Sequence, residues 1–141
     1  MTASFAGCEL CASEGGEVLY RNDKYRVVLV DDAQYPGFCR VIWHAHVKEM
    51  TDLSADDRDG LMRAVWQVEQ AIRAVMQPEK INLACFGNMT PHLHWHVIPR
   101  YLDDVHFPQP VWGTIQQTTP SSALVARRAL LPSLRAALLQ L

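Results

Sequence analysis

Histidines and apolar residues alternate through one short stretch of the chain, residues 91–101, which reads PHLHWHVIPRY. A period of two is typical of a β-strand, so we predict a strand with three imidazoles on one face and three apolar side chains on the other. The histidines are His92, His94 and His96, half of the six in the chain. A polar face on an edge strand would also give this pattern. Imidazole is a poor strand former, however, and three in register favour a functional site.

The hydrophobic pattern elsewhere predicts four more strands, a long helix and a helical C-terminal segment. Strands are expected at residues 18–21, 25–31, 38–44 and 81–86. The helix should begin after Ser54, which suits an N-cap, and end before Pro78. Apolar residues recur along it at the spacing of a core-facing stripe: Leu61, Val65, Val68, Ile72 and Val75. Residues 121–141 are expected to be helical with a break at Pro132.

The composition is that of a single globular domain spanning residues 1–141, with 49% hydrophobic and 20% charged residues. The net charge of −2 and the absence of a basic run argue against binding to nucleic acid. No apolar stretch approaches the roughly 18 residues of a membrane span, and the N-terminus lacks the pattern of a signal peptide. We therefore expect a cytoplasmic protein with reduced or metal-bound cysteines, which are Cys8, Cys11, Cys39 and Cys85.

The three imidazoles cannot all bind one metal ion if the strand is straight. At about 3.3 Å per residue, His92 and His96 are about 13 Å apart along the strand. A Zn–N bond of about 2 Å allows one ion to bridge neighbours at i and i+2, but not all three. The three histidines should therefore have different tasks. His94, with an imidazole on either side, is the candidate nucleophile or base.

Cys8 and Cys11 form a CxxC motif that has three interpretations. A redox pair is expected after a strand and at the start of a helix, and nothing strand-like precedes Cys8. Half of a metal site would need two more ligands, which the spare histidines could supply. A chance spacing is the third possibility, and the motif alone leaves all three open.

Four stretches together resemble the histidine triad (HIT) family of nucleotide hydrolases and transferases. In chain order they are PGFCRVIWHAHVKEMTDL, INLACFGN, the triad stretch PHLHWHVIPRY and, as in the bacterial branch, PVWGT. The resemblance runs from Cys8 to about Trp112. It implies an α+β fold with a mostly antiparallel five-stranded sheet, one long helix and a C-terminal helix. It also implies a core at about 8–112, a helical extension at about 121–141, and a homodimer.

The resemblance further implies an enzyme that cleaves nucleoside phosphoramidates or dinucleoside polyphosphates at the α-phosphate. His94 would attack phosphorus and form a nucleotidyl-histidine, which water would hydrolyse. His96 would bind the phosphate and assist the leaving group. The residues that the resemblance assigns to nucleotide binding are Asp31, Asn82, Asn88, Met89 and His96.

Zinc-bearing branches of the family, and the related galactose-1-phosphate uridylyltransferases, carry a CxxC motif, a later histidine and the first triad histidine. The resemblance therefore implies a structural zinc site. Two thiolates and two imidazoles suit such a closed tetrahedral site. The implied ligands are Cys8, Cys11, His46 and His92.

The chain departs from the family pattern at two positions. Phe38 replaces a histidine found in many members, which puts a supporting hydrogen bond in doubt. Met89 stands where a small hydroxyl residue is frequent, which puts protonation of the leaving group in doubt. Two other functions therefore stay open: a non-catalytic nucleotide-binding module, and a metallo-hydrolase with its metal on His94 and His96.

Overall fold

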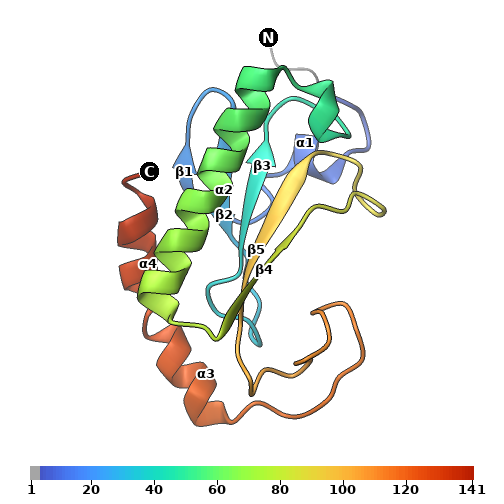
Figure 1. Ribbon diagram of the computed structural model, residues 1–141. Helices are drawn as coiled ribbons and strands as arrows, with labels where there is room; N and C mark the ends of the chain where they lie inside the picture. Colours follow the sequence, from blue (N-terminus) through green and yellow to red (C-terminus); the bar gives the residue numbers. More distant parts are fainter. Residues whose placement is uncertain (1–3) are drawn as a thin grey trace.

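A five-stranded antiparallel sheet forms the centre of the protein, as a computed structural model of residues 4–141 shows (Figure 1). The strands are ordered β1-β2-β3-β5-β4 across the sheet. They are β1 (Glu17–Arg21), β2 (Tyr25–Leu29), β3 (Cys39–Trp43), β4 (Lys80–Ala84) and β5 (His94–Arg100). The helices are α1 (Glu9–Ala12), η1 (Met50–Asp52), α2 (Ala55–Met76), α3 (Ser121–Arg128) and α4 (Leu131–Leu138). The expected α+β fold, with its long helix and its C-terminal helix, is confirmed.

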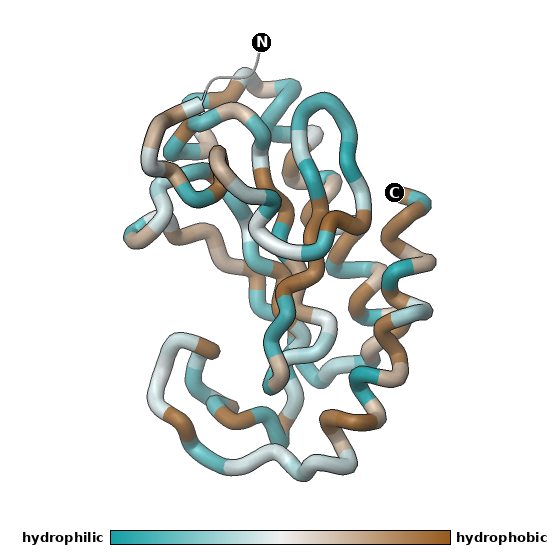
Figure 2. The backbone as a smooth tube through the Cα atoms, turned by 180° about the vertical axis from the view of Figure 1, so that it is seen from behind, coloured by the Kyte–Doolittle hydropathy of each residue, from teal (hydrophilic) through white to brown (hydrophobic). Residues whose placement is uncertain are grey.

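The long helix α2 covers one face of the sheet (Figure 1). Ser54 caps it, because its hydroxyl oxygen accepts a hydrogen bond from the backbone N–H of Asp57. Gln77, in a left-handed conformation, ends it just before Pro78. The predicted stripe packs on alternate residues of the central strands, which are Val27, Val41 and Val97. Figure 2 shows hydrophobic stretches along these strands and at intervals along the C-terminal helices.

The C-terminal segment forms two short helices, α3 and α4, where a single helix with a break at Pro132 was expected. The chain interrupts the helix at residues 129–130, and Pro132 lies in the first turn of α4. Proline is tolerated there because its missing N–H would have no helical partner. Leu134 and Leu138 are fully buried, since α4 packs against α2 and β1. Within residues 4–141, no helix is long and apolar enough to cross a membrane.

The opposite face of the sheet carries the polar residues of interest. The β3–β5 register places Arg40 opposite His96 and Ile42 opposite His94, so these side chains share one face. Two small apolar clusters cover the ends of this face. One joins the N-terminal segment to Val28 and Ile42, and the other is formed by Tyr35, Phe38 and Ile98. The polar residues therefore lie between two packed ends.

Gly15 allows the N-terminal segment to cross this face closely. Its φ of +82° lies in the left-handed region that glycine adopts without strain. A Cβ atom there would lie 2.8 Å from both Ile42 Cδ1 and Leu10 Cδ2. The backbone of Gly15 thus comes near enough for its carbonyl to accept a hydrogen bond from Arg40 at 3.1 Å.

Candidate functional site

His94 and His96 line a cavity of about 330 Å³ on the polar face of the sheet. Both side chains are largely buried, and their ring centroids are 4.8 Å apart with the planes nearly perpendicular. His92 lies two residues before His94, ahead of the strand, and does not line the cavity. The full lining is Arg40, Phe86, Gly87, Asn88, Met89, Thr90, His94, His96 and Trp112.

His94 is held in the tautomer that a nucleophile needs. Its Nδ1 lies 2.6 Å from the backbone carbonyl oxygen of His92. A carbonyl oxygen only accepts hydrogen bonds, so Nδ1 carries the proton and Nε2 keeps a free lone pair. Burial also lowers the pKa of His94 from its ordinary value. The ring is therefore neutral at pH 7, with a nitrogen available for attack.

His96 stands beside His94 and is buried to a similar extent. Burial, followed by the charges of His94 and Arg40, lowers the pKa of His96 to about 3. Its buried Nδ1 has no hydrogen-bond partner within the described part of the chain. The ring of Phe38 meets His96 edge-on, with centroids 5.6 Å apart. An apolar ring thus occupies the place where many family members would carry a histidine.

The loop that follows β4 forms one wall of the cavity. Gly87 has a φ of +104°, which a residue with a side chain rarely adopts. The loop turns there and brings Asn88, Met89 and Thr90 to the cavity. Met89 is 96% exposed, and its backbone can approach a bound phosphate.

Asp31 and Asn82 do not line the cavity that contains His94. Asp31 is exposed beyond the end of β2 and faces a separate hollow together with Arg128 and Arg135. Asn82 lies within β4, and its Oδ1 accepts a hydrogen bond from Arg100 at 2.7 Å. Nucleotide binding by these two residues stays a prediction.

Of the cavity residues that were not singled out from the sequence, two lie beside His96. Trp112 packs against His96 with centroids 5.0 Å apart and against Phe86 at 4.9 Å. It is the tryptophan of PVWGT, a stretch that carried a resemblance but no assigned role. Arg40 enters the cavity from β3. Arg40 is two residues from Ile42 in the strand, so the sequence could indicate that the two side chains share a face. Only the pairing with β5 puts Arg40 beside His96.

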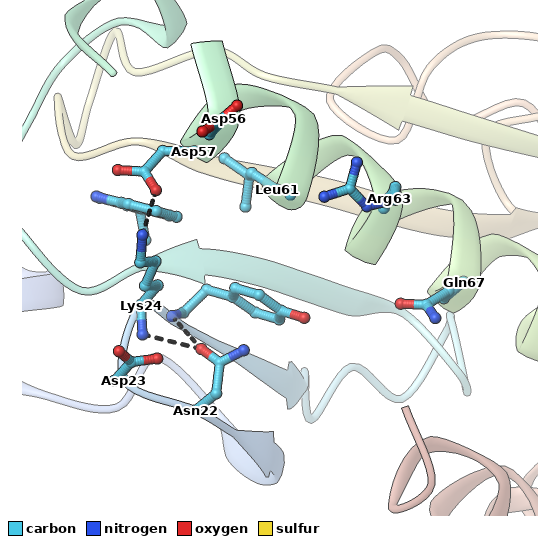
Figure 3. A pocket seen from close by; sticks show the side chains of 11 residues that line it. Asn22, Asp23, Lys24, Asp56, Asp57, Leu61, Arg63 and Gln67 are labelled. Atoms are coloured by element: carbon cyan, nitrogen blue, oxygen red, sulfur yellow. Dashed lines mark hydrogen bonds and ion pairs between the residues drawn. The ribbon is translucent and has the colours of Figure 1, made fainter. Parts of the chain in front are cut away.

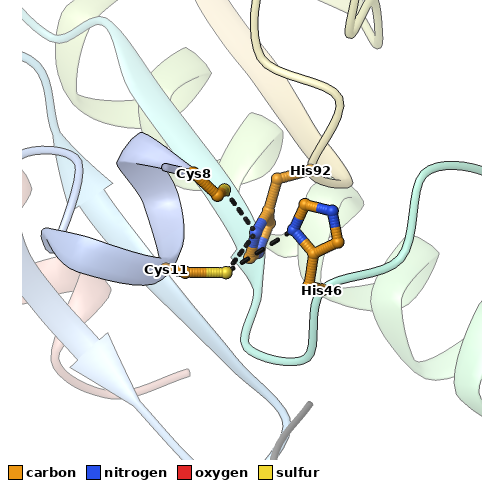
Figure 4. Close-up of side chains that lie close together, drawn as sticks. All are labelled: Cys8, Cys11, His46 and His92. Carbon is orange, nitrogen blue, oxygen red and sulfur yellow. Dashed lines mark hydrogen bonds between the residues drawn. The ribbon is translucent and has the colours of Figure 1, made fainter. Parts of the chain in front are cut away.

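Four potential metal ligands converge beside this cavity (Figure 4). Cys8 Sγ lies 3.3 Å from His92 Nδ1, and Cys11 Sγ lies 3.5 Å from the Nδ1 atoms of both His92 and His46. In a tetrahedral zinc site, Zn–S and Zn–N bonds of about 2.3 and 2.0–2.1 Å put S and N about 3.5 Å apart. The donor atoms of Cys8, Cys11, His46 and His92 all lie within 4.8 Å of one another.

The tautomer of His92 also suits a metal ligand. Its Nε2 lies 2.6 Å from the carbonyl oxygen of Trp43 and so carries the proton, which leaves Nδ1 free to coordinate. His44 is engaged elsewhere, between Arg26 and the carbonyl of Asn22. Within residues 4–141, the four side chains form the one group of three or more potential ligands. Their chemistry fits Zn²⁺, and the structure thereby favours the metal interpretation of the CxxC motif.

A second hollow lies between the start of α2 and the β1–β2 turn (Figure 3). Two of its polar side chains have partners: Lys24 Nζ contacts Asp57 Oδ1, and Asn22 Oδ1 accepts hydrogen bonds from the backbone of Lys24 and Tyr25. No histidine or cysteine lines it. The pair of Lys24 and Asp57 connects the turn to the helix.

Comparison with known proteins agrees with this geometry. The family model of the HIT domain matches residues 13–103. The chain belongs to the HIT domain family. It is also 28% identical over 102 residues to the AP-4-A phosphorylase of Mycobacterium tuberculosis (strains H37Rv and CDC 1551), which covers 68% of this chain. The chain spans about half the length of these relatives, since the match covers 52% of them.

Solved structures of HIT proteins share the whole fold. A histidine triad protein from Bradyrhizobium japonicum is 24% identical with a TM-score of 0.75, covering 99% of this chain and 98% of its own. One from Marinobacter aquaeolei is 25% identical with a TM-score of 0.71, covering 95% and 98%. A zinc-bound family protein from Mycobacterium smegmatis is 21% identical with a TM-score of 0.62, covering 95% and 94%.

Proposed function

We propose that this HIT protein is a nucleotidyl hydrolase or transferase that cleaves its substrate at the α-phosphate, with His94 as the nucleophile. The observation that carries the proposal is the hydrogen bond from His94 Nδ1 to the His92 carbonyl, which leaves Nε2 as the free nitrogen in the cavity. The distant likeness to AP-4-A phosphorylase supports nucleotide chemistry. Dinucleoside polyphosphates and nucleoside phosphoramidates are the two substrate classes to compare.

In the first step, Nε2 of His94 forms a bond to the α-phosphorus while the bond from phosphorus to the leaving group breaks. The electron pair of that bond goes to the leaving oxygen, or to the leaving nitrogen of a phosphoramidate, which takes up a proton from solvent. In the second step, water attacks phosphorus, the P–N bond breaks, and its electron pair returns to Nε2. One proton of the water passes to solvent, and a nucleoside monophosphate is released. Splitting the displacement in this way replaces one difficult step with two easier ones.

The surrounding residues stabilise the charge that develops on phosphorus. The backbone of Asn88 and Met89 lies at the wall of the cavity, where N–H groups can donate to the phosphate oxygens. His96 is neutral because its pKa is lowered to about 3, so it offers one N–H to an oxygen of the phosphate or the leaving group. We assign His94 and His96 to catalysis on this basis.

The zinc-bound relative from Mycobacterium smegmatis supports a zinc ion at the four-residue cluster of Cys8, Cys11, His46 and His92. A bound zinc would cross-link the N-terminal segment to the segment just before β5, and so have a structural role. His92 then has two tasks. Its side chain coordinates, and its backbone carbonyl orients His94. We also propose that the protein forms a homodimer and is cytoplasmic.

The two other functions have less support. A metallo-hydrolase would need a third ligand beside His94 and His96. The one group of potential metal ligands within residues 4–141 contains neither histidine. A binding module would not need the oriented Nε2 lone pair. Hydrolysis assays with diadenosine tetraphosphate and adenosine 5′-phosphoramidate separate these functions from the proposal.

We expect the wild type to release AMP from at least one of the two substrates, and His94→Ala to lose roughly 10³-fold or more in kcat/KM. His106→Gln is the matched control, because His106 bonds to Tyr35 outside the cavity. It should keep the wild-type rate. Nucleotide binding without turnover of either substrate would replace the proposal with the binding module.

A further inference from the structure

Arg40 is a cation in the cavity that has no carboxylate partner. Its Nη1 donates to the carbonyl of Gly15, and its buried Nε has no acceptor within the described residues. No acidic side chain in residues 4–141 forms a salt bridge with it. Burial lowers the pKa of Arg40, which the charge of Glu9 partly offsets, yet a guanidinium keeps its proton in proteins. Arg40 is half-buried, and a partly desolvated charge without a counter-charge favours an anion in the cavity.

The two arginines that are buried within residues 4–141, Arg26 and Arg100, are satisfied by the protein itself. Arg100 forms a salt bridge with Asp104 at 2.8 Å and bonds further to Asn82 and a backbone carbonyl. Arg26 donates to three backbone carbonyls of the N-terminal segment and to His44. Within residues 4–141, Arg40 makes one hydrogen bond for its five N–H donors. It is thus the guanidinium in the lining of the cavity that has capacity left for a ligand.

The sheet register puts this capacity next to the reacting atoms. Arg40 pairs directly with His96 across the β3–β5 ladder, and His94 is its diagonal neighbour. Directly opposite Cβ atoms lie about 4.5–5.5 Å apart, and diagonal neighbours about 7–8 Å, still within the reach of a long side chain. A substrate whose α-phosphate lies in the cavity for attack by the His94 nitrogen can therefore have its leaving group within reach of Arg40.

We propose that Arg40 binds the leaving group and that this group is a phosphate or polyphosphate. This inference rests on the function proposed above. When the bond from the α-phosphorus to its bridging oxygen breaks, the electron pair stays on that oxygen and the leaving group gains one negative charge. A guanidinium stabilises such charge with paired N–H donors. In a phosphoramidate the pair goes to nitrogen, which must take up a proton to leave as an amine. Arg40 gives that step no proton and no counter-charge.

Substrate discrimination tests the assignment. We would measure kcat/KM for diadenosine tetraphosphate and adenosine 5′-phosphoramidate with the wild type, Arg40→Gln, Arg40→Lys and Arg73→Gln. Arg73 is exposed on α2, on the other side of the sheet, and controls for the loss of one charge. Arg40→Gln should lose about 10- to 100-fold on the polyphosphate, the value of a charge-assisted hydrogen bond, and less than about threefold on the phosphoramidate.

Arg40→Lys keeps the charge, so its kcat/KM on the polyphosphate should fall, but less than that of Arg40→Gln. This second variant keeps the inference testable if Arg40→Gln folds poorly. Thermal unfolding midpoints identify such a case. Equal losses on both substrates, or no loss on the polyphosphate in either variant, would overturn the inference.

Binding of inorganic pyrophosphate, measured by calorimetry, separates this inference from the proposed function. The wild type should bind it, and Arg40→Gln should bind at least about tenfold more weakly. If neither nucleotide is cleaved but pyrophosphate binding depends on Arg40, the enzymatic function fails and the anion site stands. If binding is the same in the wild type and in both Arg40 variants, the anion site fails.

Discussion

The backbone carbonyl of His92 accepts the Nδ1–H of His94 at 2.6 Å, while the side chain of His92 lies 3.3 Å from Cys8 Sγ. One residue therefore joins the proposed zinc site to the proposed nucleophile. The imidazole of His92 is fixed at both nitrogens, by Trp43 on one side and by the thiols on the other. This fixation holds the backbone that sets the tautomer of His94. The proposed zinc ligand His92 and the proposed nucleophile His94 are thus neighbouring members of the triad.

Removal of zinc should lower stability before it lowers activity. Without the ion, the N-terminal segment loses its cross-link to the segment before β5. We expect a chelator to reduce the thermal midpoint, with turnover falling only as the protein unfolds. Elemental analysis should find one zinc per chain in the wild type and less in Cys11→Ser. Cys85→Ser is the control, since Cys85 lies outside the cluster. Immediate loss of turnover in a folded, zinc-free protein would mean that the metal is catalytic.

The pH dependence of kcat/KM should report the lowered pKa of His94. Only the neutral imidazole attacks phosphorus, and burial lowers its pKa from the ordinary value of 6.5. The active form therefore persists as the pH falls below 6.5, and the rate declines only when the pH passes the lowered pKa. A dinucleoside polyphosphate is the suitable substrate, because its internal phosphates stay ionised in this range. A decline centred at or above pH 6.5 would contradict the assignment.

Asp104 should be a major source of stability for the end of β5 and the segment after it. It is fully buried and accepts hydrogen bonds from Arg100, Tyr35 and the backbone of Tyr101 and Phe107. Asp104→Asn leaves the Arg100 charge uncompensated, so we expect a loss of about 3–5 kcal/mol in the free energy of unfolding. Chemical denaturation measures it.

The acid side of the stability curve gives a second check on Asp104. Burial alone would raise the pKa of this carboxyl, but the hydrogen bonds from Arg100 and the backbone hold it below its usual range. The stabilisation is present above the unfolded pKa and is lost as the pH falls through the lower folded value. Asp104→Asn should therefore make the free energy of unfolding less dependent on pH in the acid range. Glu17→Gln, which breaks an exposed pair with Arg135, should lower the free energy of unfolding by less than about 1 kcal/mol and leave its dependence on acid pH unchanged.

Local patterns in the sequence predicted the parts of the site that depend on periodicity. The alternation in β5 put His94 and His96 on the face opposite Val97, and the Ser54 cap marked the start of α2. The resemblance to HIT proteins then supplied the ligand set that the structure brings together. These features depend on short-range patterns or motifs, so they can be recognised in a single sequence.

The features that were missed depend on long-range pairing. Arg40 becomes a cavity residue only through the register of β3 with β5, which its own neighbours Cys39 and Val41 do not encode. Trp112 reaches His96 from an irregular segment that has no period to read. The break between α3 and α4 falls at residues 129–130, where the sequence has no glycine or proline. Packing of α4 on α2 and β1 accompanies that break.

The central claim is that His94 becomes covalently nucleotidylated during turnover. Rapid chemical quenching of the wild type with diadenosine tetraphosphate or adenosine 5′-phosphoramidate, followed by intact-mass and peptide analysis, tests it most directly. We predict a transient adenylyl adduct on His94 that is absent from His94→Ala. Turnover without any adduct, or an adduct on His96, would contradict the account and assign the attack to water or to the other histidine.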